Sequence, residues 1–380
     1  MKLVKNATVY APGALGTRDV LLGGGKILLV DRDIRVTGLP IETIDATGMI
    51  LTPGLVDQHV HLTGAGGQQG FASMTPPVEL SALVACGTTT VLGMLGTDGT
   101  TRSLQALHAK AAALEEEGLT AYMLTSYFAY PPVTLLGSVR NDLLFVDKVI
   151  GCKIAISDER ASYPTAGELA RLVADIHVAG MLSRKGGILH VHLGALDTRM
   201  GLLLELVEKY RVPVRRLSPT HVGRDEALFD EATRFARLGG MIDISTGGTR
   251  FDEPYRQVLR ALRQGVPVDR ITFSSDGNAG VVARDAGGNV TGYRVAPLDK
   301  NLEQVIKLIT DGGLDPADAF ALVTANPARN LSLPRKGRIV AGADADLCLF
   351  DERYALRDVF ARGQRLMQEG VIIKKGNFEN

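Results

Sequence analysis

Two histidines separated by one residue, His59 and His61, lie in the apolar segment LVDQHVHL at 55–62. Side chains two residues apart on a β-strand point to the same side, so this pair could bind one metal ion. Imidazole suits zinc and similar borderline metals, and a carboxylate often completes such a site. The pair alone is weak evidence, because most such pairs in strands bind no metal.

Further residues that could take part lie in other apolar segments, namely Lys153, His192, His221 and Asp276. A buried, unpaired ammonium is costly, so Lys153 in VIGCKIAI must be paired, shifted in pKa or chemically modified. His190 and His192 form a second same-face pair; His192 is nearer the strand end, so we predict it as the ligand and His190 as a lining or core residue. Asp276 could accept a proton from metal-bound water, although in SSDGN it could also cap a turn.

The middle of the chain alternates short apolar segments with helical ones. The predicted strands lie at 55–62, 88–95, 120–127, 149–156, 188–194, 217–223, 241–247 and 271–277. Helical periodicity predicts helices at 103–118, 168–182, 200–210, 227–240 and 255–265. This alternation predicts an α/β fold, a (β/α)8 TIM-like barrel whose catalytic groups come from the carboxyl ends of its strands. The candidate residues fall at or near those ends, so we predict that together they hold one or two divalent metal ions.

The two ends of the chain show a different sequence pattern, which predicts short strands joined by glycine turns. Neither end is long enough to bury a good core alone. We therefore expect residues 1–53 and 335–380 to form one small β-sandwich domain, beside a barrel of residues 54–334.

Composition limits the partners and the compartment. Lys+Arg and Asp+Glu both number 42 in 380 residues, so no net charge favours nucleic acid or a membrane surface. The three cysteines are widely spaced and form no CxxC motif, which favours a reducing compartment. The first residues lack the pattern of a signal peptide, and no apolar segment reaches the ~18 residues of a spanning helix. We predict a soluble, cytoplasmic protein.

Taken together, the HVH after GLVDQ, the strand lysine, the single histidines and SSDGN resemble the amidohydrolase superfamily. The chain is most similar to the isoaspartyl (β-aspartyl) dipeptidase family, nearly from end to end, with matches in VIGCKIAISDER and LSPTHVGRDEALFDEA. The resemblance implies a dipeptidase that cleaves β-aspartyl dipeptides by a metal-bridging hydroxide, assembled as a homo-oligomer such as an octamer.

The same resemblance implies roles for individual residues. Two divalent metal ions, expected to be zinc, would be bound by His59, His61 and Asp276 and by His192 and His221, and bridged by a CO2-derived carbamate on Lys153. Asp276 would be the catalytic residue that carries the proton to the leaving amine. The implied substrate contacts are Gly66, Gln68, Thr97, Phe128, Arg160, Arg224 and Gly280. The two arginines match positions that bind substrate carboxylates, a pairing that suits a guanidinium group, although surface ion pairs are the simpler alternative.

Three substrate positions depart from the family. Gln68 stands where the family has a glutamate that meets the substrate ammonium, and Gly280 where it has a serine. Phe128 aligns with a tyrosine that polarises the scissile carbonyl, and losing such a donor costs about 10²–10³ in rate; Tyr127 or Tyr130 could restore the hydroxyl from a shifted loop. We predict an amide hydrolase for acidic substrates with an N-blocked, cyclic or uncharged amino end. A cyclic amidase, a deaminase and a non-catalytic barrel remain alternatives.

Overall fold

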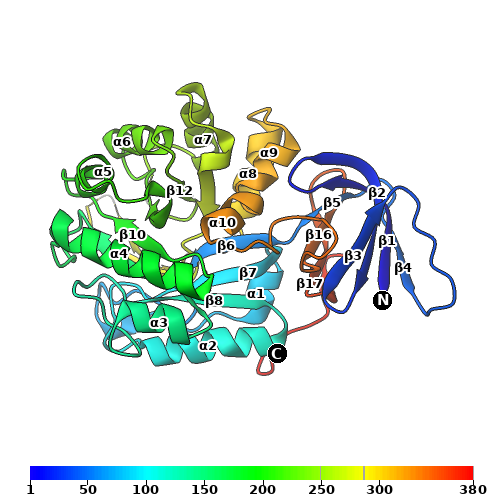
Figure 1. The fold of residues 1–380 in the computed structure, drawn as a ribbon, viewed down its shortest axis with the longest axis horizontal. Coiled ribbons are helices and arrows are strands. Elements are labelled where there is room, and N and C mark those ends of the chain that lie inside the picture. Colours follow the sequence, from blue (N-terminus) through cyan, green and yellow to red (C-terminus); the bar gives the residue numbers. More distant parts are fainter. Residues whose placement is uncertain (249, 286, 380) are drawn as a thin grey trace.

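A computed structural model describes residues 1–248, 250–285 and 287–379. Eight parallel strands follow one another in chain order around a barrel (Figure 1). They are β6 (Leu55–Val60), β7 (Thr88–Gly93), β8 (Thr120–Thr125), β9 (Val149–Ile156), β10 (Ile188–Leu193), β11 (Leu217–Thr220), β12 (Ile242–Ser245) and β13 (Ile271–Ser274). A parallel bridge between Val60 and Gly277 brings the first and last strands together. The predicted fold is confirmed.

Helices cover the outside of this barrel (Figure 1). They are α1 (Leu80–Val84), α2 (Leu104–Glu117), α3 (Val139–Phe145), α4 (Ala166–Ser183), α5 (Gly201–Glu208), α6 (Glu226–Arg237), α7 (Pro254–Arg263), α8 (Lys300–Thr310), α9 (Pro316–Ala321) and α10 (Ala325–Asn330), with 3-10 turns at Phe71–Ser73, Val214–Arg216 and Val268–Arg270. In α4, Leu169, Val173 and Ile176 are buried at the helical period, and a capping box of Thr165 and Glu168 starts the helix. The five predicted helices are therefore confirmed, apart from small shifts of their ends.

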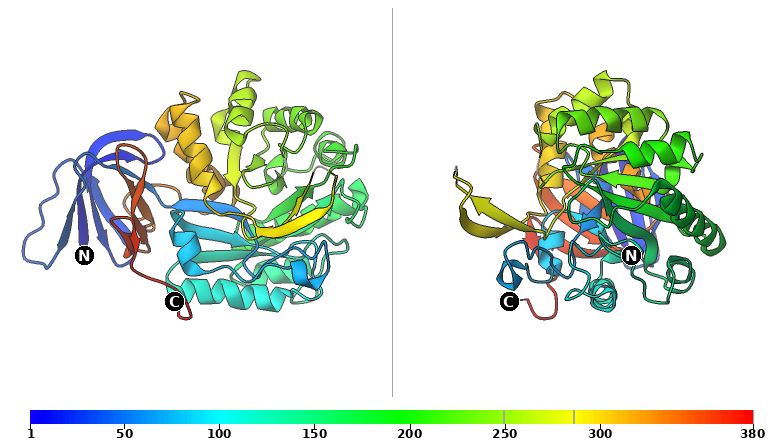
Figure 2. Two further views of the ribbon diagram at one scale, coloured as in Figure 1. Left: turned by 180° about the vertical axis from the view of Figure 1, so that it is seen from behind. Right: turned by 90° about the vertical axis from the view of Figure 1, so that its left-hand side faces the viewer.

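A hairpin that the sequence pattern did not reveal follows the last barrel strand. Its strands β14 (Gly280–Arg284) and β15 (Val290–Val295) are antiparallel. The right view of Figure 2 shows it, in yellow, projecting from the side of the barrel. Its first strand begins four residues after Asp276, and residues of that strand line the same pocket as Asp276.

The two ends of the chain meet in a second sheet. Its nine strands are β1 (Lys2–Tyr10), β2 (Ala14–Gly23), β3 (Lys26–Asp31), β4 (Glu42–Asp45), β5 (Ile50–Pro53), β16 (Leu347–Phe350), β17 (Leu356–Ala361), β18 (Gln364–Gln368) and β19 (Val371–Ile372). β16 pairs antiparallel with β5, which confirms that the two ends pair. Val9, Leu51, Leu347 and Phe360 contribute to its buried core. The exact limits of the two domains, 53/54 and 334/335, stay a prediction.

Candidate active site

One pocket lies at the carboxyl ends of the barrel strands, with a volume of about 420 Å³, within the usual range for small-molecule sites. Every residue predicted for metal or substrate contact lines it. These residues are His59, His61, Gly66, Gln68, Thr97, Phe128, Lys153, Arg160, His192, His221, Arg224, Asp276 and Gly280. The parallel strands thus bring together side chains that are far apart in the sequence, as the predicted topology requires.

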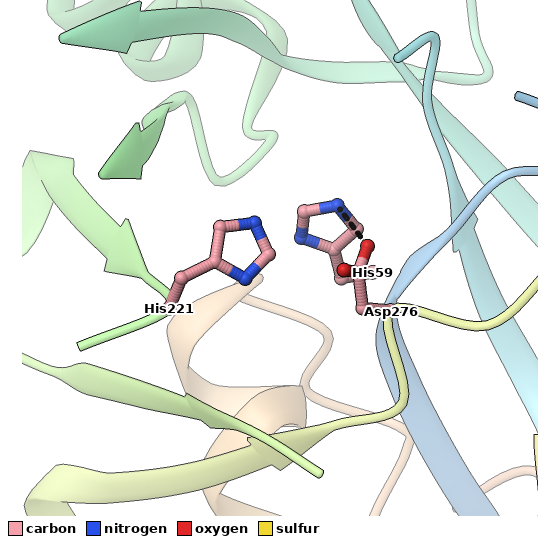
Figure 3. Close-up of side chains that lie close together, drawn as sticks. All are labelled: His59, His221 and Asp276. Atoms are coloured by element: carbon pink, nitrogen blue, oxygen red, sulfur yellow. Dashed lines mark ion pairs between the residues drawn. The ribbon is translucent and has the colours of Figure 1, made fainter. Parts of the chain in front are cut away.

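The centre of the pocket is a group of histidines around one carboxylate. Nε2 of His59 and Nε2 of His61 each lie 3.3 Å from Oδ1 of Asp276. The ligand atoms of His59, His221 and Asp276 all lie within 4.8 Å of one another (Figure 3). His192 is close by, its ring centre 4.6 Å from that of His221. Imidazole nitrogens and a carboxylate converging in this way fit a divalent metal such as zinc.

The backbone at two of these positions is unusual. His221 and Asp276 have φ angles of 65° and 52°, a left-handed conformation that is uncommon outside glycine. His221 directly follows β11, and Asp276 lies two residues beyond the end of β13. Asp276 is therefore not simply a turn or cap residue, because its carboxylate faces the histidines.

Hydrogen bonds behind the pocket hold the histidine rings. Nδ1 of His59 lies 3.1 Å from Nε2 of His190, and Nδ1 of His221 lies 2.6 Å from Oγ of Ser245. Because Nδ1 makes these bonds, Nε2 of His59 and Nε2 of His221 remain available to a ligand in the pocket. Partners of this kind commonly fix the tautomer and orientation of metal-binding histidines. His190 is fully buried in the barrel, in agreement with its prediction as a lining or core residue.

Lys153 lies at the base of the pocket and is fully buried. Its Nζ is 3.3 Å from Nε2 of His59. Burial lowers the pKa of Lys153 to about 7, although Asp276 opposes the shift. A lowered pKa is one of the three possibilities that the sequence left for this lysine. Burial thus favours the uncharged amine, which is the form that can be chemically modified.

The charge of Asp276 results from opposing effects. Burial alone would raise its pKa, but His221 and His61 hold it below its usual range. Burial also lowers the pKa of His59 and His221 far below the ordinary value for histidine. The site therefore offers neutral imidazoles and an ionised carboxylate, the protonation states in which these groups bind metal.

The two predicted arginines both line the pocket, but their surroundings differ. Arg160 donates from Nε and Nη2 to the carboxylate of Asp158, at 2.7 and 2.6 Å, and its Nη1 reaches the hydroxyl of Thr97 at 3.5 Å. Arg224 donates from Nε to the carbonyl of Leu193 at 3.2 Å. Arg224 does not form a simple surface ion pair, because its side chain is largely buried and burial lowers its pKa.

Asp158 was not predicted, although its contacts make it part of the site. Its buried carboxylate is shared between Arg160 and His192, whose Nε2 lies 3.1 Å from Oδ2. A neutral His192 that donates from Nε2 keeps Nδ1 free as a ligand atom. The only sequence signal was its place, five residues after Lys153 and two residues beyond the end of the same strand.

Replacing Asp158 by asparagine is expected to weaken metal binding on the His192 side about 10- to 100-fold, because the ring loses the carboxylate that fixes its tautomer. Competition with a chelator, followed by metal analysis, measures this directly. Asp197→Asn is the matched control, since Asp197 is almost fully exposed. Equal metal retention by both variants would contradict a positioning role for Asp158.

The residues that depart from the family also lie in the pocket. The ring of Phe128 packs on His192 with 4.3 Å between ring centres and is buried. Among the described residues, neither Tyr127 nor Tyr130 lines this pocket, and Tyr130 lines a different one. The idea that a neighbouring tyrosine supplies the missing hydroxyl is therefore not supported.

The third departure, Gly280, has a packing reason. A Cβ atom at this position would lie 2.9 Å from Cα of Gly66 and 3.1 Å from the carbonyl oxygen of Ser73. A serine would thus need a shift of the loop that carries Gly66. The hairpin instead contributes Val281 and Val282 to the wall, two apolar contacts that the sequence did not predict.

Comparison with known proteins places this arrangement in context. The amidohydrolase family model matches residues 50–377. The crystal structure of a β-aspartyl dipeptidase from Fervidobacterium islandicum AW-1, in complex with the β-Asp-Leu dipeptide, is 40% identical over the whole of both chains, with a TM-score of 0.92. A dihydroorotase from Pelotomaculum thermopropionicum is 26% identical over 92% of this chain and 88% of that protein. Dihydropyrimidinase from Brevibacillus agri NCHU1002, 17% identical over 99% of this chain and 96% of its own, shares the fold with a TM-score of 0.70.

Proposed function

The chain belongs to the amidohydrolase family, and on that basis we propose that it cleaves the amide bond of a β-aspartyl substrate whose amino end carries no charge. The coarser statement, a metal-dependent amide hydrolase of the dipeptidase type, follows from the family match and the 40% identity to a β-aspartyl dipeptidase. The observation that supports the finer proposal is the pocket itself, which combines the histidine–Asp276 group with Arg160 and Arg224.

We propose that this group holds two zinc ions. His59, His61 and Asp276 would bind one and His192 and His221 the other, with Lys153 between them as a carbamate formed with CO2. The uncharged amine that burial favours at Lys153 is the form that reacts with CO2. When bound, the metals supply Lewis acidity, which polarises a carbonyl group and makes water a nucleophile at neutral pH.

The chain's own side chains perform the remaining steps. The ionised carboxylate of Asp276 accepts a proton from the attacking water and donates it to the nitrogen of the leaving amine. Arg160 and Arg224 bind the carboxylates of the substrate, because a guanidinium group can donate two parallel hydrogen bonds to one carboxylate. Asp158 holds Arg160 in place for this contact.

The proposal of an uncharged amino end rests on the charges of the pocket. Asp276 is the only acidic residue among the described residues that line it, and it faces the histidines. Gln68 can accept a hydrogen bond but cannot form an ion pair with an ammonium group. A free amino group would therefore lose part of its hydration in the pocket without gaining an ion pair.

We expect N-acetyl-β-aspartyl-leucine to be hydrolysed with a kcat/KM at least about tenfold higher than β-aspartyl-leucine, since one unmatched charge commonly costs more than 1.4 kcal/mol. Amine release from both compounds by metal-loaded protein measures the ratio. A higher kcat/KM for the free dipeptide would overturn the substrate preference and leave amide hydrolysis standing.

A cyclic amide is the second candidate, favoured by the similarity to dihydroorotase along most of both chains. The variants Arg160→Ala and Arg224→Ala separate the two possibilities. They are expected to impair the turnover of acidic amides and to leave that of neutral cyclic amides unchanged.

Assembly and location stay predictions. A homo-oligomer such as an octamer is testable by light scattering coupled to size-exclusion chromatography. None of the described helices is long and apolar enough to cross a membrane. The predicted cytoplasmic location can be tested by cell fractionation.

A further inference from the structure

A second pocket lies at the opposite end of the barrel, with a volume of about 290 Å³. Its lining comes from the turns that precede β10, β11, β12 and β13 and from the end of α10. Since all barrel strands run in the same direction, these turns mark the amino end of the barrel, away from the metal pocket. The side chains that matter are Lys185, Arg215, Arg216, Arg270, Arg329 and Asn330.

The described lining contains lysine and arginine side chains but no carboxylate. One carboxylate outside the lining, that of Asp269, lies 3.0 Å from Nη1 of Arg329 and 3.7 Å from Nε of Arg270. Asp147 acts on Lys185 from a greater distance, through its charge alone. The cations of the pocket therefore outnumber the carboxylates near them.

The other hydrogen bonds of these cations do not neutralise their charge. Arg216 donates from Nη1 to the carbonyl of Gly187 at 3.0 Å, and Arg270 from Nη1 to that of Gly239 at 3.1 Å. These bonds stabilise the turns at the strand starts, which is the structural reason for the two arginines. A carbonyl group is a neutral dipole, so the positive charge remains available to a ligand.

Two positive charges, those of Arg215 and Arg216, follow each other directly in the chain. The pKa of Arg216 is lowered by burial and further by the charge of Arg215. Among the described residues, none forms an ion pair or hydrogen bond with the side chain of Arg215, which is exposed at the pocket edge. Like charges held this close repel one another, and an anion between them would relieve that repulsion.

The floor of the pocket is held by buried hydrogen bonds. Asn330 is buried, and its Nδ2 donates to Oε1 of Gln58 and to Oγ of Ser218, both at 2.9 Å. Both partners belong to the barrel interior. The cations thus border a hollow whose floor is held by buried hydrogen bonds; Lys185, Arg216 and Arg270 are partly buried, and Arg215 and Arg329 are exposed at its edge.

We propose that this pocket binds a small molecule that carries a phosphate group. A phosphate monoester carries almost two negative charges near pH 7, whereas a carboxylate carries one, so phosphate better matches the excess of cations. Guanidinium groups bind phosphate oxygens in pairs. The volume accommodates a phosphate with a small substituent.

The test is calorimetric titration of the full-length, metal-loaded protein with inorganic phosphate, at constant ionic strength. The native protein is expected to bind phosphate, and Arg215→Ser is expected to weaken the binding about tenfold, the effect of losing one charge-assisted hydrogen bond. Arg184→Ser is the matched control, because Arg184 is an exposed arginine next to Lys185 that does not line the pocket. Titration with acetate tests the preference for a doubly charged anion.

Four results would overturn the proposal. The native protein could show no binding of phosphate. Arg184→Ser could weaken binding as much as Arg215→Ser, which would indicate only a diffuse positive field. Acetate could bind as tightly as phosphate. Finally, Arg224→Gln could abolish binding while Arg215→Ser leaves it unchanged, which would place the anion in the metal pocket.

Discussion

Replacing Asp276 by asparagine is expected to lower kcat for amide hydrolysis by about 10³-fold or more. Asparagine keeps an oxygen at the same place but cannot accept the proton of the attacking water and pass it on, a role worth about 10²–10⁴ in rate. The carboxylate is ionised because His221 and His61 hold its pKa below the usual range. Initial rates with saturating N-acetyl-β-aspartyl-leucine measure the loss.

Metal analysis must accompany that measurement, because Asp276 is also a proposed ligand. The matched comparison is His61→Asn, which removes a proposed ligand that carries no proton in the reaction. If proton transfer is the main role, Asp276→Asn remains nearly inactive even in samples whose metal content equals that of the native protein. Activity that recovers fully with added zinc would show that Asp276 acts as a ligand only.

The position of the site could be predicted because it depends on topology. In a parallel barrel every strand ends at the same rim, so His59, Lys153, His192 and Asp276 had to lie near one another once their strands were recognised. The strands were recognisable because segments buried on both faces form continuous apolar runs.

The contacts between side chains could not be predicted in this way. That Asp158 joins His192 to Arg160 depends on side-chain directions across two neighbouring strands, β9 and β10, and not on spacing along either. The hairpin that begins at Gly280 was missed because no residue of β15 is buried, so this strand has no buried face to set an alternating pattern. Such contacts follow from packing, which a linear pattern does not contain.

The second large effect is an increase in kcat, at one of the positions that depart from the family. Phe128→Tyr is expected to raise kcat for β-aspartyl substrates about 10²-fold, because a phenol placed beside the reacting carbonyl can donate to the developing oxyanion. The ring of Phe128 already packs on His192 and lines the pocket, so the added hydroxyl borders the space in which the substrate must lie. Steady-state kinetics on both β-aspartyl-leucine and its N-acetyl form measure the gain.

The variant Gln68→Glu tests recognition of the substrate's amino end through KM, independently of the effect of Phe128→Tyr on kcat. The added carboxylate is expected to lower KM for β-aspartyl-leucine about tenfold through an ion pair with the ammonium group, and to leave KM for the N-acetyl form unchanged or higher. Tyr127→Phe is the control for the hydroxyl, since Tyr127 does not line the pocket. A large loss of activity in Tyr127→Phe, together with no gain in Phe128→Tyr, would show that the neighbouring tyrosine already supplies the donor. A gain in Phe128→Tyr alone would show that the metal site is complete and that the missing donor limits cleavage of β-aspartyl substrates.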